Sequence, residues 1–286
     1  MVSGDPNSLY LRPKTLDEAV TLLASSSGQI LAGGTDFYPA LGERLPQGRV
    51  VDITALREIR GITFEPEQIR IGGLTTWSDV IRAPLPHCFD ALKAAAREVG
   101  SVQIQNRGTV AGNLCNASPA ADGVPPLLVL DAEVELASAT GMRRIPLGQF
   151  LAGNRKTQRR PDEILTAVLV PRRMENAASA FLKLGARRYL VISVSMVAVV
   201  VQSDATGRVA EAHIAVGACS AKALRLTALE HALQGLPFNR GIGSAVKPEH
   251  LAPLTPIDDV RATAAYRRDA SLTLVQRALE SCVEAR

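Results

Sequence analysis

Apolar residues recur at helical spacing near the start of the chain. Residues 16–23 (LDEAVTLL) place Leu16, Ala19, Val20 and Leu23 on a single face when drawn as a helix. A stripe of this width is typical of a surface helix that buries one side against a core. The pattern therefore predicts an amphipathic helix here.

Short apolar runs bounded by glycine predict strands in the same region. Residues 30–32 form a short apolar run that Gly33 and Gly34 interrupt, and residues 48–54 (GRVVDIT) form another. Residues 69–82 (IRIGGLTTWSDVIR) change from alternating to helical spacing across a glycine pair. We expect strands in the first two segments and a strand, a turn and a helix in the third.

Helix-ending signals continue this mixed pattern. Either Thr76 or Ser78 could cap the helix just described, and residues 89–100 (FDALKAAAREVG) predict another helix that ends at Gly100. Residues 125–138 (PPLLVLDAEVELAS) predict a short helix that leads into a strand. The first part of the chain is thus a mixture of helices and strands.

Strands dominate the next part of the chain. Residues 181–220 predict strands joined by the turn at residues 203–208 (SDATGR). The longest apolar run, Tyr189–Val201, is too short to span a bilayer and rich in β-branched residues, so we expect a buried strand. The tail from residue 224 predicts helices, because its apolar residues recur every three or four positions.

A charged segment with a proline divides these two regions. Residues 170–181 (VPRRMENAASAF) are the candidate linker. We expect a mixed α/β domain over residues 1–172 and a sheet-plus-helices domain over residues 176–286.

Residues 107–123 (RGTVAGNLCNASPAADG) break the regular pattern. They are crowded with Gly, Ala, Ser and Asn, and their one acid, Asp122, comes near the end. We interpret them as a long loop that buries poorly. Long irregular segments in compact domains are usually functional or disordered, and the regular pattern on both sides favours function.

This loop and residues 31–37 (LAGGTDF) are the two candidate binding segments. Small side chains let a ligand approach the backbone, and N–H groups in a turn can cradle an anion such as a diphosphate. Thr35, Thr109 and the two asparagines of the long loop would add hydrogen bonds. The alternative for Gly33–Gly34 is a simple turn after a strand. Neither segment is a GxGxxG or GxxxxGK[ST] motif.

Composition and charge exclude several classes of function. The net charge is only +4, basic residues are scattered and aromatics are 4% of the chain, whereas nucleic-acid proteins more often show basic stripes with aromatics. The cysteines at positions 88, 115, 219 and 282 form no CxxC pair, and no HExxH motif is present. We therefore expect no nucleic-acid partner and no metal site. Scattered cysteines suit a reducing cytoplasm, and no signal peptide or transmembrane segment is expected.

The two loops together resemble a known family. AGGTD and NRGTVAGNLCNASPAAD are similar to the FAD-binding medium subunits of molybdenum hydroxylases, relatives of xanthine dehydrogenase and carbon monoxide dehydrogenase. The resemblance extends over nearly the whole chain, from YLRPKTLDEAVTLL through IRIGGLTTWSDV and FLKLGARR to AYRRDASLTLVQRAL. It implies an α+β fold: a two-part FAD-binding domain of the PCMH (vanillyl-alcohol oxidase-like) type, then a smaller domain with an antiparallel sheet and a helix bundle.

The resemblance also implies which residues bind FAD. Both glycine-rich loops would wrap the diphosphate, with the isoalloxazine ring between the two domains. The residues carried over by motif are Leu31, Ala32, Gly33, Gly34, Thr35, Asp36, Gly108, Thr109, Ala111, Gly112, Asn113, Cys115, Asn116, Asp122, Leu165 and Lys183. None is expected to be catalytic, since the flavin carries the redox chemistry.

Three of these positions, and Gln105 beside the second loop, have open alternatives or depart from the family pattern. Asp122 matches a family acid on the ribose or adenine side of FAD, but an acid at a helix N-terminus is an equal alternative. Lys183 matches a position near the flavin, or is a solvated lysine at a strand end. Ala111 stands where the family usually has glycine, and Gln105 where it usually has arginine. These two substitutions affect the expected loop geometry and charge.

The implied function is electron transfer within a larger enzyme. Such a subunit passes electrons from 2Fe-2S clusters on a small subunit to FAD and then to an external acceptor such as NAD, a quinone or oxygen. The substrate reacts at molybdopterin on a large subunit, and the assembly is expected to be a dimer of heterotrimers. Two alternatives stay open, namely a freestanding FAD-dependent oxidase and a non-catalytic assembly subunit. The C-terminal pattern argues against the oxidase.

Overall fold

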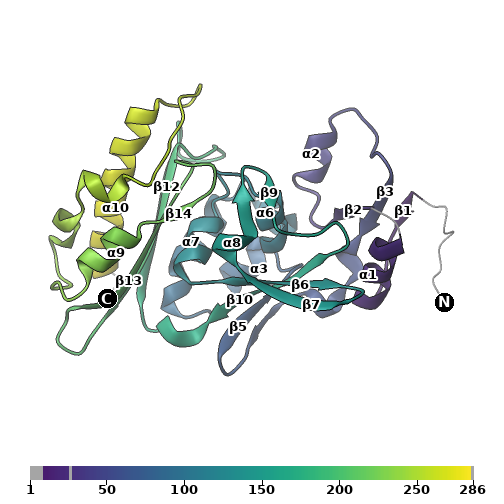
Figure 1. Cartoon of the computed structure of the whole chain (residues 1–286), viewed down its shortest axis with the longest axis horizontal. Coiled ribbons are helices and arrows are strands. Elements are labelled where there is room, and N and C mark those ends of the chain that lie inside the picture. The colour runs from purple at the N-terminus through teal and green to yellow at the C-terminus, as the bar shows by residue number, and fades with distance from the viewer. Residues whose placement is uncertain (1–8, 26–27, 285–286) are drawn as a thin grey trace.

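The computed structural model describes residues 9–25 and 28–284. We expect no signal peptide at the N-terminus. Most of that segment, residues 1–8, lies outside the described residues. Three sheets with their helices follow one another along the long axis of the molecule (Figure 1).

The first part of the chain is built on a small parallel sheet. Strands β1 (Tyr10–Leu11), β2 (Gly28–Leu31) and β3 (Arg49–Asp52) pair in the order β1-β3-β2. Helix α1 (Leu16–Ser25) follows β1, and the short helix α2 (Phe37–Leu41) stands away from the sheet (Figure 1). The predicted helical face is confirmed, since the buried residues of α1 are Ala19, Val20 and Leu23.

The second part is a five-stranded antiparallel sheet. Its strands are β4 (Ile62–Phe64), β5 (Gln68–Gly72), β6 (Glu133–Ser138), β7 (Gly141–Pro146) and β10 (Ile164–Pro171). They pair in the order β4-β5-β10-β6-β7. Strand β10 is buried along most of its length because it occupies the centre of the sheet.

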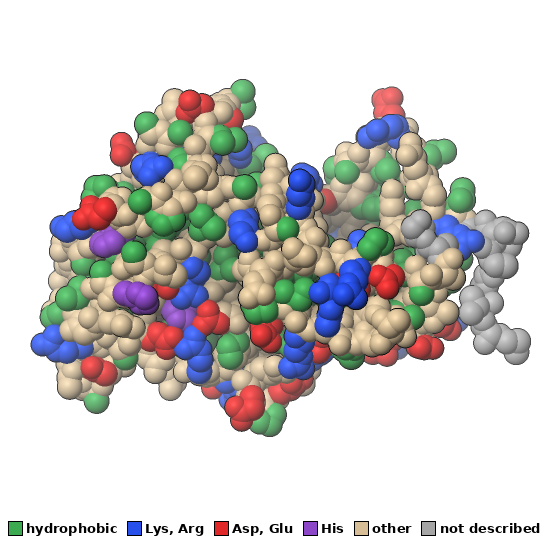
Figure 2. Space-filling model, viewed as in Figure 1, with side chains coloured by type: hydrophobic (Ala, Val, Ile, Leu, Met, Phe, Trp, Pro, Cys, Tyr) green, Lys and Arg blue, Asp and Glu red, His purple; other side chains and the backbone are tan. Residues whose placement is uncertain are grey.

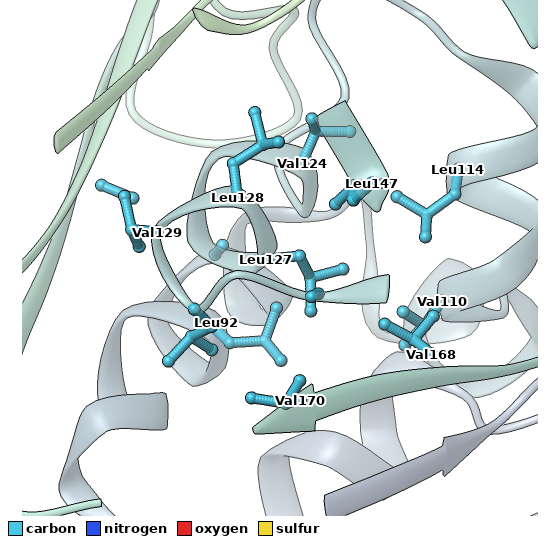
Figure 3. Packing of buried hydrophobic residues seen from close by; sticks show 14 of the residues in the cluster. Leu92, Val110, Leu114, Val124, Leu127, Leu128, Val129, Leu147, Val168 and Val170 are labelled. Carbon is cyan, nitrogen blue, oxygen red and sulfur yellow. The ribbon is translucent and has the colours of Figure 1, made fainter. Parts of the chain in front are cut away.

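Helices from the middle of the chain surround this sheet. They are α3 (Trp77–Arg82), α4 (Asp90–Glu98), α5 (Val102–Arg107), α6 (Val110–Asn116), α7 (Val124–Val129) and α8 (Leu147–Phe150). A small hairpin of β8 (Leu151–Gly153) and β9 (Lys156–Thr157) follows. Figure 3 shows the core in this region, with Leu92 of α4 and Leu127 of α7 close to Val170 of β10.

The predicted start of α3 and the predicted end of α4 are confirmed. The Thr76 hydroxyl accepts a hydrogen bond from the Asp79 N–H at 3.2 Å and so caps α3. Helix α4 ends just before Gly100, whose φ of +56° is a left-handed conformation that glycine adopts without strain.

The expectation of an irregular, poorly buried loop at residues 107–123 is wrong. Its middle forms α6, which is N-capped by Thr109 through a 3.0 Å hydrogen bond from the Gly112 N–H. Val110, Ala111 and Leu114 are buried in the core. The helix escapes a periodicity search because small residues separate its few large apolar ones.

The C-terminal part is a four-stranded antiparallel sheet covered by helices. Strands β11 (Ala178–Leu184), β12 (Ser195–Ser203), β13 (Val209–Gly217) and β14 (Leu224–Arg225) pair in sequence order. The helices of the tail are α9 (Thr227–Leu233) and α10 (Ala264–Glu284). Both lie on the outer face of the sheet (Figure 1).

Short 3-10 turns complete the chain. They are η1 (Ile53–Ala55), η2 (Arg57–Ile59), η3 (His87–Phe89), η4 (Arg172–Met174), η5 (Ile242–Ala245) and η6 (Pro248–Leu251). Turn η4 is the only such element in the predicted linker, so the connection between β10 and β11 is short.

The buried strand expected at Tyr189–Val201 is only half correct. Strand β12 begins at Ser195, and the residues before it form a loop in which Tyr189, Leu190 and Ile192 are 60%, 54% and 62% exposed. An apolar run in the sequence does not show at which residue hydrogen bonding to the neighbouring strands begins. Here the loop turns away from the sheet.

Strand β12 contributes to two hydrophobic cores. Val197, Val199 and the other odd-numbered apolar residues pack with α9 and α10, whereas Met196, Ala198 and the even-numbered ones pack with α4 and α7. Successive side chains of a strand point to opposite faces, which explains the alternation. The C-terminal sheet therefore lies between two helical layers, and its inner face shares one of these cores with the first half of the chain.

The outer surface carries mixed charge. Figure 2 shows Lys and Arg side chains interspersed with Asp and Glu across the face in view.

Candidate cofactor-binding site

A cavity of about 480 Å³ lies where the two predicted loops meet. This size is within the usual range for a small-molecule site. Its lining residues are Ile30, Ala32, Gly33, Gly34, Thr35, Asp36, Phe37, Ala40, Ile53, Gly73, Trp77, Val99, Ile104, Gly108, Thr109, Ala111, Gly112, Asn113, Cys115, Asn116, Arg159, Ile164 and Leu165.

The backbones of the two loops are in direct contact. A Cβ atom at position 33 would lie 2.0 Å from the carbonyl oxygen of Arg107, and one at position 108 would lie 3.4 Å from the Thr35 hydroxyl. Side chains at position 33 are therefore excluded by the second loop itself. These two glycines bring together segments that are far apart in the sequence.

The second loop is held in place by the turn that begins α3. The Trp77 N–H donates to the Gly108 carbonyl at 3.2 Å, and the Val110 N–H donates to the Thr75 carbonyl at 3.0 Å. These bonds make a bridge between Thr76 and Thr109. These hydrogen bonds thus hold the first turn of α6 in place at the cavity wall.

One polar atom in this cavity wall lacks a partner within the described residues. The side-chain oxygen of Asn113 is buried and accepts no hydrogen bond. Buried polar atoms are nearly always paired in native proteins, so this unpaired oxygen is unusual. Asn113 packs close to Gly123, where a Cβ atom would lie 3.1 Å from the same oxygen. Gly123 does not line the cavity, so this oxygen faces the protein interior beside the cavity wall.

Most of the predicted site residues line the cavity, and three do not. Leu31 is buried and lines a neighbouring cavity of about 500 Å³, on which Arg12, Arg60 and Arg107 also border. The two cavities share Gly33 and Gly34. The other two residues, Asp122 and Lys183, border neither.

Asp122 and Lys183 form a buried ion pair with each other. The Lys183 Nζ lies 2.6 Å from one Asp122 oxygen, and the Ser193 hydroxyl donates to the other at 2.7 Å. The side chains are only 7% and 9% exposed. Burial raises the pKa of the Asp122 carboxyl above its usual value, although Lys183 and Ser193 act in the opposite direction. The pair joins the segment before α7 to strand β11, across the junction of the two halves.

Several lining residues were not predicted from the sequence. Val99, Ile104 and Ile164 give the cavity an apolar side together with Phe37 of the first predicted segment, and Arg159 adds a positive charge. Arg159 belongs to the densest basic group of the sequence, residues 155–160, which is its only signal. Isolated apolar residues look like ordinary core residues until the fold places them on a cavity wall.

The two departures from the family pattern are accommodated. Ala111 lies within α6, where helical backbone needs no glycine, and its methyl group is buried. Gln105 is buried and donates from Nε2 to the Arg97 carbonyl at 3.0 Å. Gln105 therefore stabilises the packing of the protein interior and does not line the cavity.

Comparison with known proteins decides the family. The family model described as the FAD binding domain in molybdopterin dehydrogenase matches residues 4–173. The chain belongs to this family. A second model, the CO dehydrogenase flavoprotein C-terminal domain, matches residues 180–282.

Relatives that match most of the chain support the same assignment. The chain is 33% identical over 281 residues to the xanthine dehydrogenase FAD-binding subunit of Escherichia coli O157:H7, with 96% of both chains covered. It is 36% identical over 247 residues to the nicotinate dehydrogenase FAD-subunit of Eubacterium barkeri, with 84% of this chain and 83% of that one covered. The resemblance inferred from the loop motifs is thereby confirmed.

A solved structure confirms the predicted fold class. The chain superposes on a chain of carbon monoxide dehydrogenase from Hydrogenophaga pseudoflava with a TM-score of 0.87, 30% identity and 96% coverage of both chains. The enzyme in that structure lacks the Mo-pyranopterin moiety of the molybdenum cofactor. Within residues 9–25 and 28–284 of the present chain, no helix is both long and apolar enough to cross a membrane.

Proposed function

We propose that the cavity between the two glycine loops holds FAD, with the diphosphate along Gly33–Thr35 and Thr109–Asn116. The single observation that supports this most is the contact between the loops, because Gly33 packs on the Arg107 backbone and leaves a cavity beside both segments. The Thr35 and Thr109 hydroxyls, which line the cavity, would donate hydrogen bonds to the phosphates. Phe37, Ile104 and Ile164 would contact its apolar surface.

The chain is an FAD-carrying electron-transfer subunit of a heteromeric molybdenum dehydrogenase. FAD, when bound, supplies the two-electron redox chemistry. The residues of this chain position it and exclude water, which explains why the site needs no nucleophile or general base. Molybdopterin and 2Fe-2S clusters are carried by partner subunits.

Further features of the assembly are part of the proposal. We place the FAD-binding domain at residues 1–172 and the C-terminal domain at residues 176–286. We assign Asp122 and Lys183 to the flavin's surroundings through their ion pair, which joins the segment before α7 to β11 at the domain junction. We place the enzyme in the cytoplasm, because the four free cysteines suit a reducing compartment.

Release of the flavin tests the cofactor assignment. We expect the purified full chain to hold one FAD per polypeptide, without a covalent bond. After denaturation, all flavin should appear in the supernatant with the absorbance and mass of FAD. Recovery of FMN, flavin that stays on the polypeptide, or no binding after reconstitution with FAD would contradict the proposal.

Co-expression with the adjacent reading frames tests the assembly. We expect a stable complex with a small 2Fe-2S subunit and a large molybdenum subunit, of a mass that fits a dimer of heterotrimers. The docking face of this chain should lie near the FAD loops and the domain junction, since electrons must pass from a cluster to the flavin. Size-exclusion chromatography with light scattering measures the mass. A monomeric chain that oxidises a substrate by itself would overturn this.

A further inference from the structure

A separate cavity of about 520 Å³ opens at the junction of the two halves. From the first half, it is lined by Ser118, Pro119 and Ala120, which follow α6, and by Asn154 of the β8–β9 turn. From the second half, its lining includes Ile192, Ala218, Ala221, Ile257, Arg261 and Arg267. The Ala218 N–H donates to the Pro119 carbonyl at 2.9 Å and holds the two sides together.

This junction cavity lies close to the candidate FAD cavity. Asn116 lines the FAD cavity, and Ser118, two residues later, lines the junction cavity. Arg155 donates to the Asn116 side chain, and its neighbour Asn154 borders the junction cavity. The two cavities thus border neighbouring residues of the same segments, which is a suitable position for a molecule that exchanges electrons with a bound flavin.

The junction cavity is positively charged. Its described lining includes two arginines and no acid. Arg261 and Arg267 both pair with the same carboxylate, Asp259, at 2.6 and 2.7 Å. Within the described part of the chain, Asp259 is the one carboxylate that forms an ion pair with either guanidinium. The three groups together therefore keep one uncompensated positive charge.

The two arginines have different roles in the cavity. Arg267 is 1% exposed and is fixed by hydrogen bonds to the Val194 and Ala218 carbonyls, yet its Nε has no partner within the described residues. Arg261 is partly exposed and also donates to the Ser193 carbonyl at 3.3 Å. Arg267 thus holds Asp259 in place, and Arg261 can present its remaining N–H donors to an anion.

The mouth of the cavity is open and apolar. Ile192 and Ile257 are 62% and 65% exposed, although both are large aliphatic residues. A pocket with an apolar rim and a few fixed polar groups is typical of small-molecule sites. The arginine pair would set the charge of the ligand, and the rim would contact its uncharged part.

We propose that this junction cavity binds the anionic group of the external electron acceptor, against Arg261. The inference rests on the proposed function, because it requires a reduced flavin on the other side of the cavity wall. The acceptor is thereby assigned to the chemical class of small anionic oxidants. A positive cavity raises the local concentration and association rate of such ligands.

Ferricyanide and 1,4-benzoquinone are suitable probes, because one is anionic and the other uncharged. The FAD-loaded full chain is reduced with one equivalent of dithionite under argon and mixed with either acceptor in a stopped-flow instrument. Two ferricyanide ions take the two electrons of one reduced flavin, whose N–H proton is released to solvent. We expect Arg261→Gln to lower the second-order rate constant for ferricyanide about tenfold, and that for benzoquinone less than twofold.

Binding without turnover gives an independent measurement. Ferrocyanide carries a similar charge but does not reoxidise the flavin, so calorimetric titration of the oxidised chain reports binding alone. We expect Arg261→Gln to weaken ferrocyanide binding about tenfold, and Arg261→Lys to restore most of it because the charge returns. Ala221→Trp should weaken it without any change of charge, since Ala221 is an exposed residue that lines the cavity.

A remote arginine provides the matched control. Arg240 is exposed and does not line the cavity, so Arg240→Gln removes the same net charge and should leave both rate constants within twofold. Equal losses with ferricyanide and benzoquinone, or no loss with either, would overturn the proposal. Loss of FAD from Arg261→Gln would also overturn it, because the cavity would then serve the flavin itself. Absence of FAD from the unaltered chain would instead refute the proposed function.

Discussion

Replacement of Gly33 by alanine should release the flavin. The added Cβ would lie 2.0 Å from the Arg107 carbonyl oxygen, and a backbone atom cannot move aside as a flexible side chain can. The two loops must separate, so the segments that would hold the diphosphate lose their relative position. We expect the affinity for FAD to fall at least about tenfold, which corresponds to ~1.4 kcal/mol of binding free energy. Fluorescence titration of the flavin-free chain with FAD measures this.

Gly148→Ala is the matched control for this glycine. A Cβ at position 148 would meet only a Leu128 methyl group at 3.7 Å, an ordinary contact. Its FAD affinity should equal that of the unaltered chain. Circular dichroism and thermal unfolding of the flavin-free variants separate loss of binding from loss of folding. A folded Gly33→Ala chain with unchanged FAD affinity would show that the loops do not form the site.

The buried ion pair at the domain junction predicts the largest stability effect. Lys183→Met would leave the Asp122 carboxylate buried away from solvent. Only the Ser193 hydroxyl would then stabilise its charge. Removal of one partner from a buried pair typically costs about 3–5 kcal/mol. The double variant Asp122→Asn with Lys183→Met should recover most of this free energy, because no charge remains. Urea unfolding of the full chain at neutral pH gives the values.

The pH dependence of the Lys183→Met defect follows from the pKa of Asp122. Burial raises the pKa of this carboxyl above 3.8 in the folded chain, and loss of Lys183 removes the main opposing effect. The defect should be complete above the folded pKa and shrink as the pH falls through it towards 3.8, because the protonated acid tolerates burial. Lys156→Met, at an exposed position, should change stability by no more than about 0.5 kcal/mol. A defect independent of pH would exclude Asp122 as its cause.

Local signals in the sequence were sufficient for much of the fold. The face of α1, the Thr76 cap and the end of α4 at Gly100 each depend on residues within one or two turns. The loop motifs likewise located most of the lining residues of the cavity. These features depend on local backbone chemistry, which a sequence records directly.

Features that depend on contacts between residues far apart in the sequence could not be predicted from local patterns. The Asp122–Lys183 pair joins residues 61 positions apart, and each carboxylate or ammonium group has many other possible partners in the sequence. Helix α6 was missed because its burial comes from packing on β10 and not from its own periodicity. Ile192 is exposed in a run of apolar residues, because the chain turns before the strand begins.

The alternation along β12 has a consequence for how the chain can be divided. The two halves match separate family models, yet the inner face of β12 is part of the same core as α4 and α7. A fragment that stops after residue 173 would expose the apolar faces of these helices to water, at a cost of about 25 cal/mol for each Å² uncovered. We therefore do not expect the flavin half to fold by itself. Deletion of the C-terminal sheet would be expected to yield aggregates in place of a smaller flavoprotein.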